Sequence, residues 1–227
     1  MGYQEVEIKG QLQKRPKVVS QYLIEDLVQA GTDRVFLILG EGKSDIMSYY
    51  GDGRRFGANF AYLFQEKLNG MPNALALAQP WIDDATVLFG MPDTIIEPKN
   101  VFLNLLNDHL ESSADLTLGL FPTSTPGKFG MVECDPDGTV VQTIDKPEET
   151  TLTLMWGCAC WSLKFTQLLG RYVESVADSG GEAVLGDVFN LALQEGLSVR
   201  GCEFEDGQYI DIGTSDELDI ALKQFHL

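Results

Sequence analysis

Two carboxylates stand where strands are expected to end, and they are the first residues that could carry chemistry. Asp93 follows the apolar run VLF at residues 87–89, which leaves its strand through GMP at residues 90–92. Asp211 lies within the otherwise apolar segment QYIDIGT at residues 208–214. Ligands of open α/β sheets bind at the carboxyl ends of strands, and Mg²⁺ takes one or two carboxylates together with phosphate oxygens. The pair therefore indicates a magnesium–phosphate site, with the alternative that each acid only turns or caps the chain.

Three further residues have types suited to binding a nucleotide or a phosphate. Lys146 in TIDKP (residues 143–147) is held at a strand end by Pro147, where an ammonium group can meet a phosphate. Gln65 ends a predicted strand, and an amide there can read the edge of a base. Gly70 allows close backbone approach. The alternatives are a solvated surface lysine and an ordinary strand–loop–helix connection.

The cysteines and one histidine are expected to be structural. Cys158 and Cys160 lie in the apolar run WGCACW, where strand alternation points both to one face. With Cys134 and Cys202 they form no C-x-x-C motif and no Cys/His cluster, which favours buried free thiols over zinc or disulfides. His109 is expected at the core margin of a helix.

Composition bounds the class of protein. The chain has 227 residues, 44% of them hydrophobic, which is enough for a full core and argues against disorder. Its formal net charge of −18 excludes nucleic acid and anionic membranes as binding surfaces and requires local cations or a metal at any phosphate site. No apolar run is long enough to span a membrane, and the N-terminus lacks the features of a signal peptide, so a cytoplasmic protein is expected.

Hydrophobic periodicity predicts alternating strands and helices up to residue 121 and mainly strands after it. We expect strands at residues 5–8, 34–39, 59–64, 87–89 and 115–121, the second and fourth of them buried, and helices at 16–30 and 44–50. Further helices begin at Pro72, with Trp81 facing inward, and at Pro98. This alternation is typical of a mostly parallel sheet with right-handed crossovers.

The second half is expected to contain an antiparallel insert. Strands are predicted at residues 129–134, 139–144 and 152–163, with DPDG at residues 135–138 as a hairpin signal. Helices at 165–176 and 184–195, strands at 197–204 and 208–212, and a capped helix at 214–225 complete the chain. The predicted fold class is α/β, a doubly wound, mostly parallel sheet with an inserted antiparallel section, in one domain over residues 1–227.

Seven segments in this order resemble the sugar-phosphate nucleotidyltransferase family, which includes hexose-1-phosphate thymidylyltransferases and uridylyltransferases. The resemblance covers roughly residues 14–225 and implies a fold of the nucleotide-diphospho-sugar transferase type. The segments that carry it are PKVVSQYLIEDLVQAG, GDGRRFGANFAYLFQEKLNGMPNALALA, VLFGMPDT, KFGMV, TIDKP, GEAVLGDVFNLALQEG and YIDIGTSDELDIAL.

The resemblance implies a role for each matching residue. The two metal-ligand acids of the family match Asp93 and Asp211, so Mg²⁺ is the implied cofactor. The base-reading glutamine and the glycine that follows it match Gln65 and Gly70, and Lys146 matches the lysine that holds the sugar phosphate.

Two more positions are implied to contact the sugar. Gly130 in KFGMV matches a glycine that lets the backbone approach it. Asp145 stands where the family has a glutamate that binds sugar hydroxyls, and the aspartate is one methylene shorter. Glu182 and Asp187 fall in the family's E-x-x-x-x-D motif, where Asp187 is expected to begin a helix.

The sequence departs from the family at the loop that binds the triphosphate. The family opens with a strand and a G-G-x-G-T-R-L loop that wraps the triphosphate and supplies an arginine and a lysine, and this sequence has neither. The chain is therefore expected to be N-terminally truncated relative to the family, with strand edges left unpaired in the sheet. Three explanations remain open. The sequence is a truncated gene product or has a misplaced start, the N-terminal segment fills the gap, or a partner chain fills it.

The leading hypothesis is nucleotidyl transfer from a nucleoside triphosphate to a sugar 1-phosphate, weak or inactive in this chain, with homo-oligomers left open. The alternative is a non-catalytic sugar-nucleotide-binding or regulatory protein. A metal-dependent glycosyltransferase is disfavoured because Asp93 begins no D-x-D motif, and a dehydrogenase because no G-x-G-x-x-G follows a strand.

Overall fold

The computed structural model describes residues 3–8, 11–177 and 181–213. Helices and strands alternate through its first half as predicted, after an N-terminal pair of strands. In chain order these elements are β1 (Tyr3–Ile8), β2 (Gln11–Pro16), α1 (Val19–Gln29), β3 (Arg34–Leu39), α2 (Ser44–Tyr50), η1 (Arg54–Phe56), β4 (Asn59–Phe64), α3 (Met71–Ala76), η2 (Gln79–Trp81), β5 (Val87–Gly90) and β6 (Thr94–Glu97).

The second half, as far as the structure describes it, contains the predicted antiparallel insert and three α-helices. Its elements are α4 (Val101–Ser112), β7 (Leu116–Pro122), η3 (Pro126–Lys128), β8 (Gly130–Cys134), β9 (Val140–Asp145), β10 (Leu154–Trp161), α5 (Leu163–Val176), α6 (Leu185–Gln194), β11 (Val199–Glu203) and β12 (Gln208–Asp211). The helix predicted at residues 214–225 lies outside the described residues.

Strand direction confirms the predicted fold class. The main sheet has the order β11-β7-β10-β8-β9, with β5 paired to β10. β11 runs parallel to β7, and β10 runs antiparallel to both β7 and β5, so β5, β7 and β11 share one direction. β3 and β4 form a separate parallel pair, while β8, β9 and β10 make the antiparallel insert.

Helices cover both faces of the sheet, and β10 shows the alternation most directly. Cys158 and Cys160 pack into the cluster that contains Phe102 and Leu105 of α4, together with residues of α1. Ala159 and Trp161 point the other way, into the cluster built on α5 and α6. The predicted burial of the two thiols on one face is confirmed, and burial raises the pKa of Cys160 to about 12.

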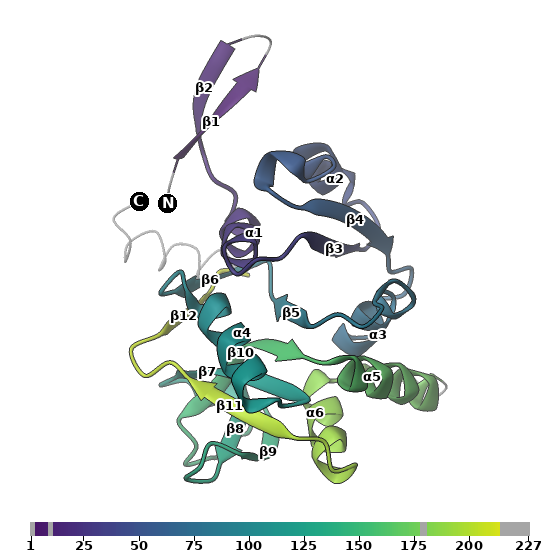
Figure 1. Ribbon diagram of the computed structural model, residues 1–227, viewed down its shortest axis with the longest axis vertical. Helices are drawn as coiled ribbons and strands as arrows, with labels where there is room; N and C mark the ends of the chain where they lie inside the picture. Colours follow the sequence, from purple (N-terminus) through teal and green to yellow (C-terminus); the bar gives the residue numbers. More distant parts are fainter. Residues whose placement is uncertain (1–2, 9–10, 178–180, 214–227) are drawn as a thin grey trace.

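Three sequence predictions near the helices were wrong in detail. The first helix begins at Val19 rather than residue 16, because residues 11–16 pair with residues 3–8 as a hairpin that extends away from the other elements (Figure 1). Trp81 is 59% exposed rather than inward, because α3 ends at Ala76 and Pro80, which lacks an amide hydrogen, leaves only the short turn η2. Strand β6 was not anticipated.

Two strands predicted to be buried are only half-buried. In β3 only Val35 is buried, and the apolar residues that follow it are partly exposed. All four residues of β5 are partly exposed as well. The reason is that β3 pairs only with β4 and β5 only with β10, so one edge of each strand has no neighbouring strand in the described part of the chain. The N-terminal hairpin does not fill this gap, since β1 and β2 pair with each other.

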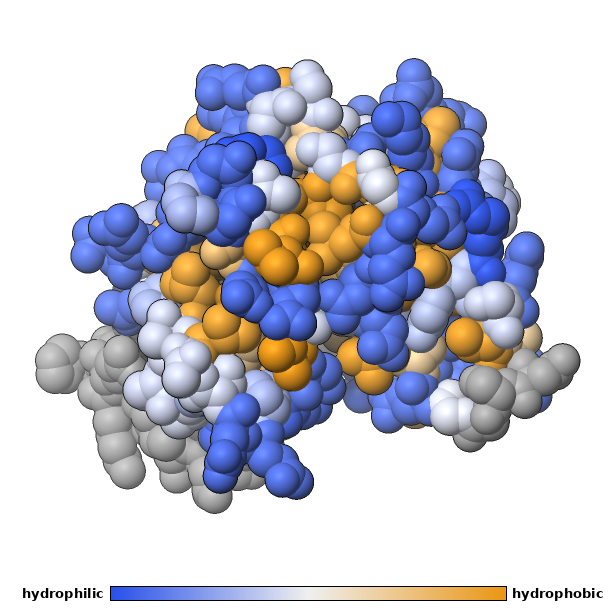
Figure 2. All heavy atoms as spheres, turned by 90° about the horizontal axis from the view of Figure 1, so that it is seen from below, coloured by the Kyte–Doolittle hydropathy of each residue, from blue (hydrophilic) through white to orange (hydrophobic). Residues whose placement is uncertain are grey.

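One face of the molecule combines hydrophilic and apolar side chains. Figure 2 shows one face on which hydrophilic side chains surround a central gathering of apolar ones. Across the described residues, no helix combines the length and the apolar character that crossing a bilayer requires.

The buried acid of α1 gives a pH-dependent stability. Asp26 is 8% exposed, and burial raises its pKa to about 7, with Lys99 opposing and Glu97 adding to the shift. The folded state therefore holds a proton that the unfolded state has lost above about pH 4. The contribution of Asp26 to stability is full at low pH and is lost as the pH rises toward 7, by up to about 1.4 kcal/mol per pH unit.

We therefore expect Asp26→Asn to stabilise the protein relative to wild type increasingly as the pH rises from about 4 to about 7, and by a constant amount above that. Urea denaturation at a series of pH values measures the difference in the free energy of unfolding. Asp33→Asn, at an exposed acid, is the control and should show no such trend. A difference for Asp26→Asn that is independent of pH would contradict the assignment.

Candidate active site

The antiparallel pair of β6 and β12 brings the two predicted acids together. Asp211 is the partner of Thr94 at one end of this pair. One residue beyond the pair, the Ile212 backbone N–H donates to the Asp93 carbonyl oxygen at 2.9 Å. Asp93 and Asp211, far apart in the chain, therefore stand side by side at the same end of the two strands.

The two carboxylates face a common point. A Cβ atom built on Gly213 would lie 3.2 Å from Asp211 Oδ1 and 3.3 Å from Asp93 Oδ2. The distance between these two oxygens therefore cannot exceed the sum of those values. The Gly213 backbone N–H donates to Asp211 Oδ1 at 2.9 Å and fixes that carboxylate, which is half-buried, whereas Asp93 is exposed. Neither acid is turned into the packed interior.

A half-buried tyrosine lies close to the two acids. Tyr209 lies on β12 two residues before Asp211, and its hydroxyl is 3.7 Å from the Met91 sulfur in the turn before Asp93. Its ring packs against Phe129 with a centroid distance of 5.8 Å. Burial, and then the negative charges of Asp211 and Asp93, raise the pKa of Tyr209, so the phenol stays neutral. The sequence analysis did not single out Tyr209, although its spacing from Asp211 places both on one face of the strand.

Phe129 connects this pair of acids to the predicted sugar-phosphate residues. In the β8–β9 pair Gly130 is the partner of Asp145, and the Lys146 backbone N–H donates to the Phe129 carbonyl oxygen at 3.0 Å. Lys146 has φ 42°, a left-handed conformation that turns the chain sharply. Its side chain is exposed and has no ion-pair partner among the residues that the structure describes. Lys146 is thus available to an incoming anion.

Close contacts with other residues of the chain explain why glycine stands at the two predicted positions. A Cβ on Gly70 would collide with the carbonyl oxygen of Ala183 and lie 2.8 Å from its nitrogen, where the two residues form a parallel bridge. A Cβ on Gly130 would enter the indole ring of Trp156. Both glycines are therefore required for packing, whatever else they contact.

Gln65 is held within its own loop. Its Nε2 atom donates to Asn69 Oδ1 and to the Gly70 carbonyl oxygen, each at 3.3 Å, and the side chain is half-buried. Within the described ranges, no hydrogen bond joins Gln65 to either carboxylate of the acid pair. The structure thus groups Gln65 with Gly70 and groups the two acids separately.

The chemistry of the acid pair fits Mg²⁺. Within the described ranges, no three His, Cys, Asp or Glu side chains gather into a metal site that the protein alone could complete. Two oxygen-donor acids at an open position are the set that Mg²⁺ uses when phosphate oxygens and water supply its other ligands. Asp93 and Asp211 are therefore the residues that could hold a divalent cation together with a phosphorylated substrate.

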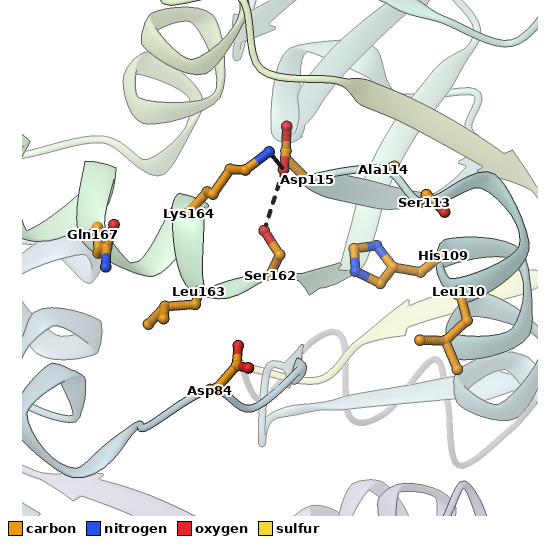
Figure 3. A pocket seen from close by; sticks show the side chains of 10 residues that line it. All are labelled: Asp84, His109, Leu110, Ser113, Ala114, Asp115, Ser162, Leu163, Lys164 and Gln167. Atoms are coloured by element: carbon orange, nitrogen blue, oxygen red, sulfur yellow. Dashed lines mark hydrogen bonds and ion pairs between the residues drawn. The ribbon is translucent and has the colours of Figure 1, made fainter.

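A separate hollow of about 410 Å³ lies between the end of α4 and the start of α5 (Figure 3). In it Lys164 reaches Asp115 at 3.0 Å, and the Ser162 hydroxyl points to the same carboxylate. Burial alone raises the pKa of Asp115, but hydrogen bonds from Lys164 and from the Ser198 backbone outweigh it and lower that pKa. His109 Nδ1 is hydrogen-bonded to Thr117 at 2.9 Å, which confirms its place at the core margin. None of the predicted site residues lines this hollow.

Comparisons with known proteins agree on one family. The sequence profile of the Nucleotidyl transferase family matches residues 7–225. A glucose-1-phosphate thymidylyltransferase from Streptomyces antibioticus is 30% identical over 207 residues, which cover 90% of this chain and 56% of the relative. The low-salt glycan biosynthesis nucleotidyltransferase Agl11 from Haloferax volcanii is 26% identical over 213 residues, or 89% of this chain and 56% of the relative. The chain thus spans little more than half the length of these two curated relatives.

A solved structure shows the same fold. It is a crystal structure from Bacillus anthracis, described as a glucose-1-phosphate thymidylyltransferase in complex with sucrose. The TM-score is 0.80 at 21% identity, and the match covers 91% of this chain and 81% of the other.

The structural role of Gly70 can be tested against a matched glycine. Gly70 (φ 105°) and Gly31 (φ 96°) both have positive φ angles, but of the two only Gly70 would place a Cβ against other atoms. We expect Gly31→Ala to lose about 1 kcal/mol of unfolding free energy through backbone strain. Gly70→Ala should lose about 2 kcal/mol more, because its Cβ overlaps the Ala183 backbone. Equal losses in urea denaturation would show that the contact with Ala183 does not require a glycine.

Proposed function

Since the chain belongs to the nucleotidyl transferase family, we propose that it transfers a nucleotidyl group from a nucleoside triphosphate to a sugar 1-phosphate. In this reaction an oxygen of the sugar phosphate forms a bond with the α-phosphorus of the triphosphate. The bond from that phosphorus to the bridging oxygen breaks on the opposite side, and pyrophosphate leaves. The product is a nucleoside diphosphate sugar. No protein nucleophile takes part, so catalysis depends on positioning and on charge neutralisation.

One observation supports this proposal above the others: Asp93 and Asp211 face the same point at the open end of β6 and β12. We assign to both acids the role of holding Mg²⁺. When bound, this ion would neutralise part of the triphosphate charge and orient the α-phosphate for attack. The backbone N–H of Gly213 keeps the Asp211 carboxylate in place for this role. Tyr209 stays neutral close to the pair, because burial and the charges of Asp211 and Asp93 raise its pKa.

The sugar phosphate is assigned to the turn that follows β9. Lys146 is exposed and without an ion-pair partner among the described residues, so its ammonium can meet the phosphate without first breaking another contact. Asp145 at the same strand end would accept hydrogen bonds from sugar hydroxyls, and Gly130 faces it across the strand pair. The ring contact between Phe129 and Tyr209 sets this turn relative to the acids.

The nucleobase is assigned to the loop between β4 and α3. Gln65 and Gly70 are joined there by a hydrogen bond, which leaves the Gln65 oxygen as an acceptor for a base edge. A nucleoside triphosphate and a sugar 1-phosphate are thus the proposed partners. A cytoplasmic reaction is in line with the four free cysteines.

A second candidate function is binding of a sugar nucleotide without turnover. The feature that favours it is that, among the described residues, no arginine or lysine forms an ion pair with Asp93 or Asp211. A product that lacks the pyrophosphate needs fewer cations around its phosphates.

Pyrophosphate release from dTTP or UTP with glucose 1-phosphate at saturating Mg²⁺ tests the proposal. We expect slow turnover, which Asp93→Asn and Asp211→Asn each reduce about 100-fold or to the detection limit. Asp206→Asn, at an exposed acid in the turn before β12, is the matched control and should keep the wild-type rate. Turnover that both site variants retain would contradict the proposed role of the acids.

Calorimetric titration with UDP-glucose and dTDP-glucose separates the two candidate functions. Product binding with measurable turnover supports the transferase. Binding that depends on Lys146 but is accompanied by no turnover supports the non-catalytic binding function. It would contradict the proposed nucleotidyl transfer for this chain.

A further inference from the structure

The hollow between the end of α4 and the start of α5 lies at the opposite edge of the sheet from the acid pair. Asp84 precedes β5, Asp115 precedes β7, and both line this hollow. Because β5 and β7 share one direction, both residues stand at the edge where these strands begin. Asp93 follows β5, at the edge where the strands end. The hollow is therefore separate from the acid pair.

One buried polar side chain points into this hollow. His109 is 3% exposed, and Figure 3 shows its ring pointing from α4 into the hollow. Its Nδ1 atom is hydrogen-bonded to Thr117 at 2.9 Å, whereas its Nε2 atom has no hydrogen-bond partner among the described residues. Burial lowers the pKa of His109, so the ring is neutral near neutral pH. A ring nitrogen without a partner in so buried a side chain is costly, and a bound molecule would satisfy it.

The other polar groups of the hollow offer both donors and acceptors. Asp84 and Gln167 line it and are exposed, and neither side chain forms a hydrogen bond or an ion pair within the described ranges. Lys164 contacts Asp115 at 3.0 Å, which leaves further N–H groups of its ammonium for a ligand. Since Asp115 neutralises Lys164, the charge of Asp84 is left over and disfavours a phosphate or another anion here.

A molecule with several hydroxyl groups fits this set. A hydroxyl both donates and accepts, so it can pair with Nε2 of His109 in either tautomer, with the carboxylate of Asp84 and with the amide of Gln167. Leu110 and Leu163 also line the hollow and add apolar surface, against which the C–H groups of such a molecule can pack. An uncharged sugar presents hydroxyl groups and C–H groups together.

We propose that this hollow is a second binding site, which binds an uncharged mono- or disaccharide through hydrogen bonds to His109, Asp84 and Gln167. Its volume of about 410 Å³ lies at the lower end of the range of ~300–1,000 Å³ that is usual for ligand pockets, which suits a molecule of this size. The proposal does not rest on the proposed nucleotidyl transfer, because none of the residues assigned to that reaction lines the hollow.

Nuclear magnetic resonance of the histidine rings tests the proposal in the full chain, without nucleotide or metal. The chain has two histidines, and His226→Gln assigns the remaining ring signals to His109. The probes are methyl α-D-glucopyranoside and maltose, and glucose 6-phosphate is the charged control. We expect one or both probes to shift the His109 signals saturably, with a dissociation constant of about 10 mM or less. Glucose 6-phosphate should bind at least about fivefold more weakly because of its charge. No saturable shift with either probe, or equal binding of glucose 6-phosphate, would overturn the proposal.

Two neighbouring acids locate the binding. Asp84 lines the hollow, whereas Asp83 does not, and both are exposed, so neither substitution should disturb the fold. Asp84→Ala should weaken binding of the sugar at least about fivefold through the lost hydrogen bonds, while Asp83→Ala should stay within about twofold of wild type. Equal effects of the two substitutions would place the sugar elsewhere and overturn the proposal.

A Lys146→Ala variant distinguishes the hollow from the proposed sugar-phosphate position. Lys146 does not line the hollow, so the sugar should shift the His109 signals as it does in the wild type. Loss of the shift in Lys146→Ala would place the sugar at the turn that follows β9 and overturn the proposal, while leaving the proposed nucleotidyl transfer untouched.

Discussion

The candidate site depends on one short antiparallel pairing, that of β6 with β12. Four residues on each strand are matched, and the apolar side chains of Ile95 and Ile96 are both buried. Thr94, also buried, donates its hydroxyl to the Met91 carbonyl oxygen at 2.8 Å and fixes the turn that presents Asp93. The register of this pair decides that Asp93 and Asp211 meet, since a shift by one residue would turn Asp211 to the other face.

Charge explains why this pairing matters for function. A chain with a formal net charge of −18 repels a triphosphate and a sugar phosphate, so phosphate binding needs positive charge at the place where it occurs. In the proposed function a divalent cation between the two acids would supply that charge locally, and Lys146, which has no ion-pair partner in the described part of the chain, would add a second positive centre. The aromatic contacts from Phe129 to Tyr209, at 5.8 Å, connect the two centres through the packed part of the structure.

Residue type and spacing predicted several strands well, because strand formation depends on local sequence. The strands at residues 34–39 and 59–64 were predicted to the residue, and the turn at residues 135–138 joins β8 and β9 as expected. The hairpin at the N-terminus was missed because its strands are polar and have no apolar face against the core. Strand β6 was missed because four residues directly after the Asp93 turn give too short a pattern.

Burial and close contacts could not be predicted in the same way. A continuous apolar run indicates a strand suited to two covered faces, but it does not say whether a neighbouring strand is present, and β3 is therefore only half-buried. The need for glycine at position 70 comes from Ala183, a residue far along the chain, so no local pattern contains it. The same holds for Gly213, whose missing side chain leaves the space that the two acids face.

The central claim is that Asp93 and Asp211 act on one ion, and a double-mutant cycle on Mn²⁺ binding tests it most directly. The affinity for Mn²⁺ in the presence of dTTP would be measured by electron paramagnetic resonance for the wild type, Asp93→Asn, Asp211→Asn and the double variant. The account predicts that both single variants bind more weakly and that the two effects are coupled by at least about 1 kcal/mol, as expected for ligands of the same ion. Losses that simply add, or no loss in either variant, would contradict it.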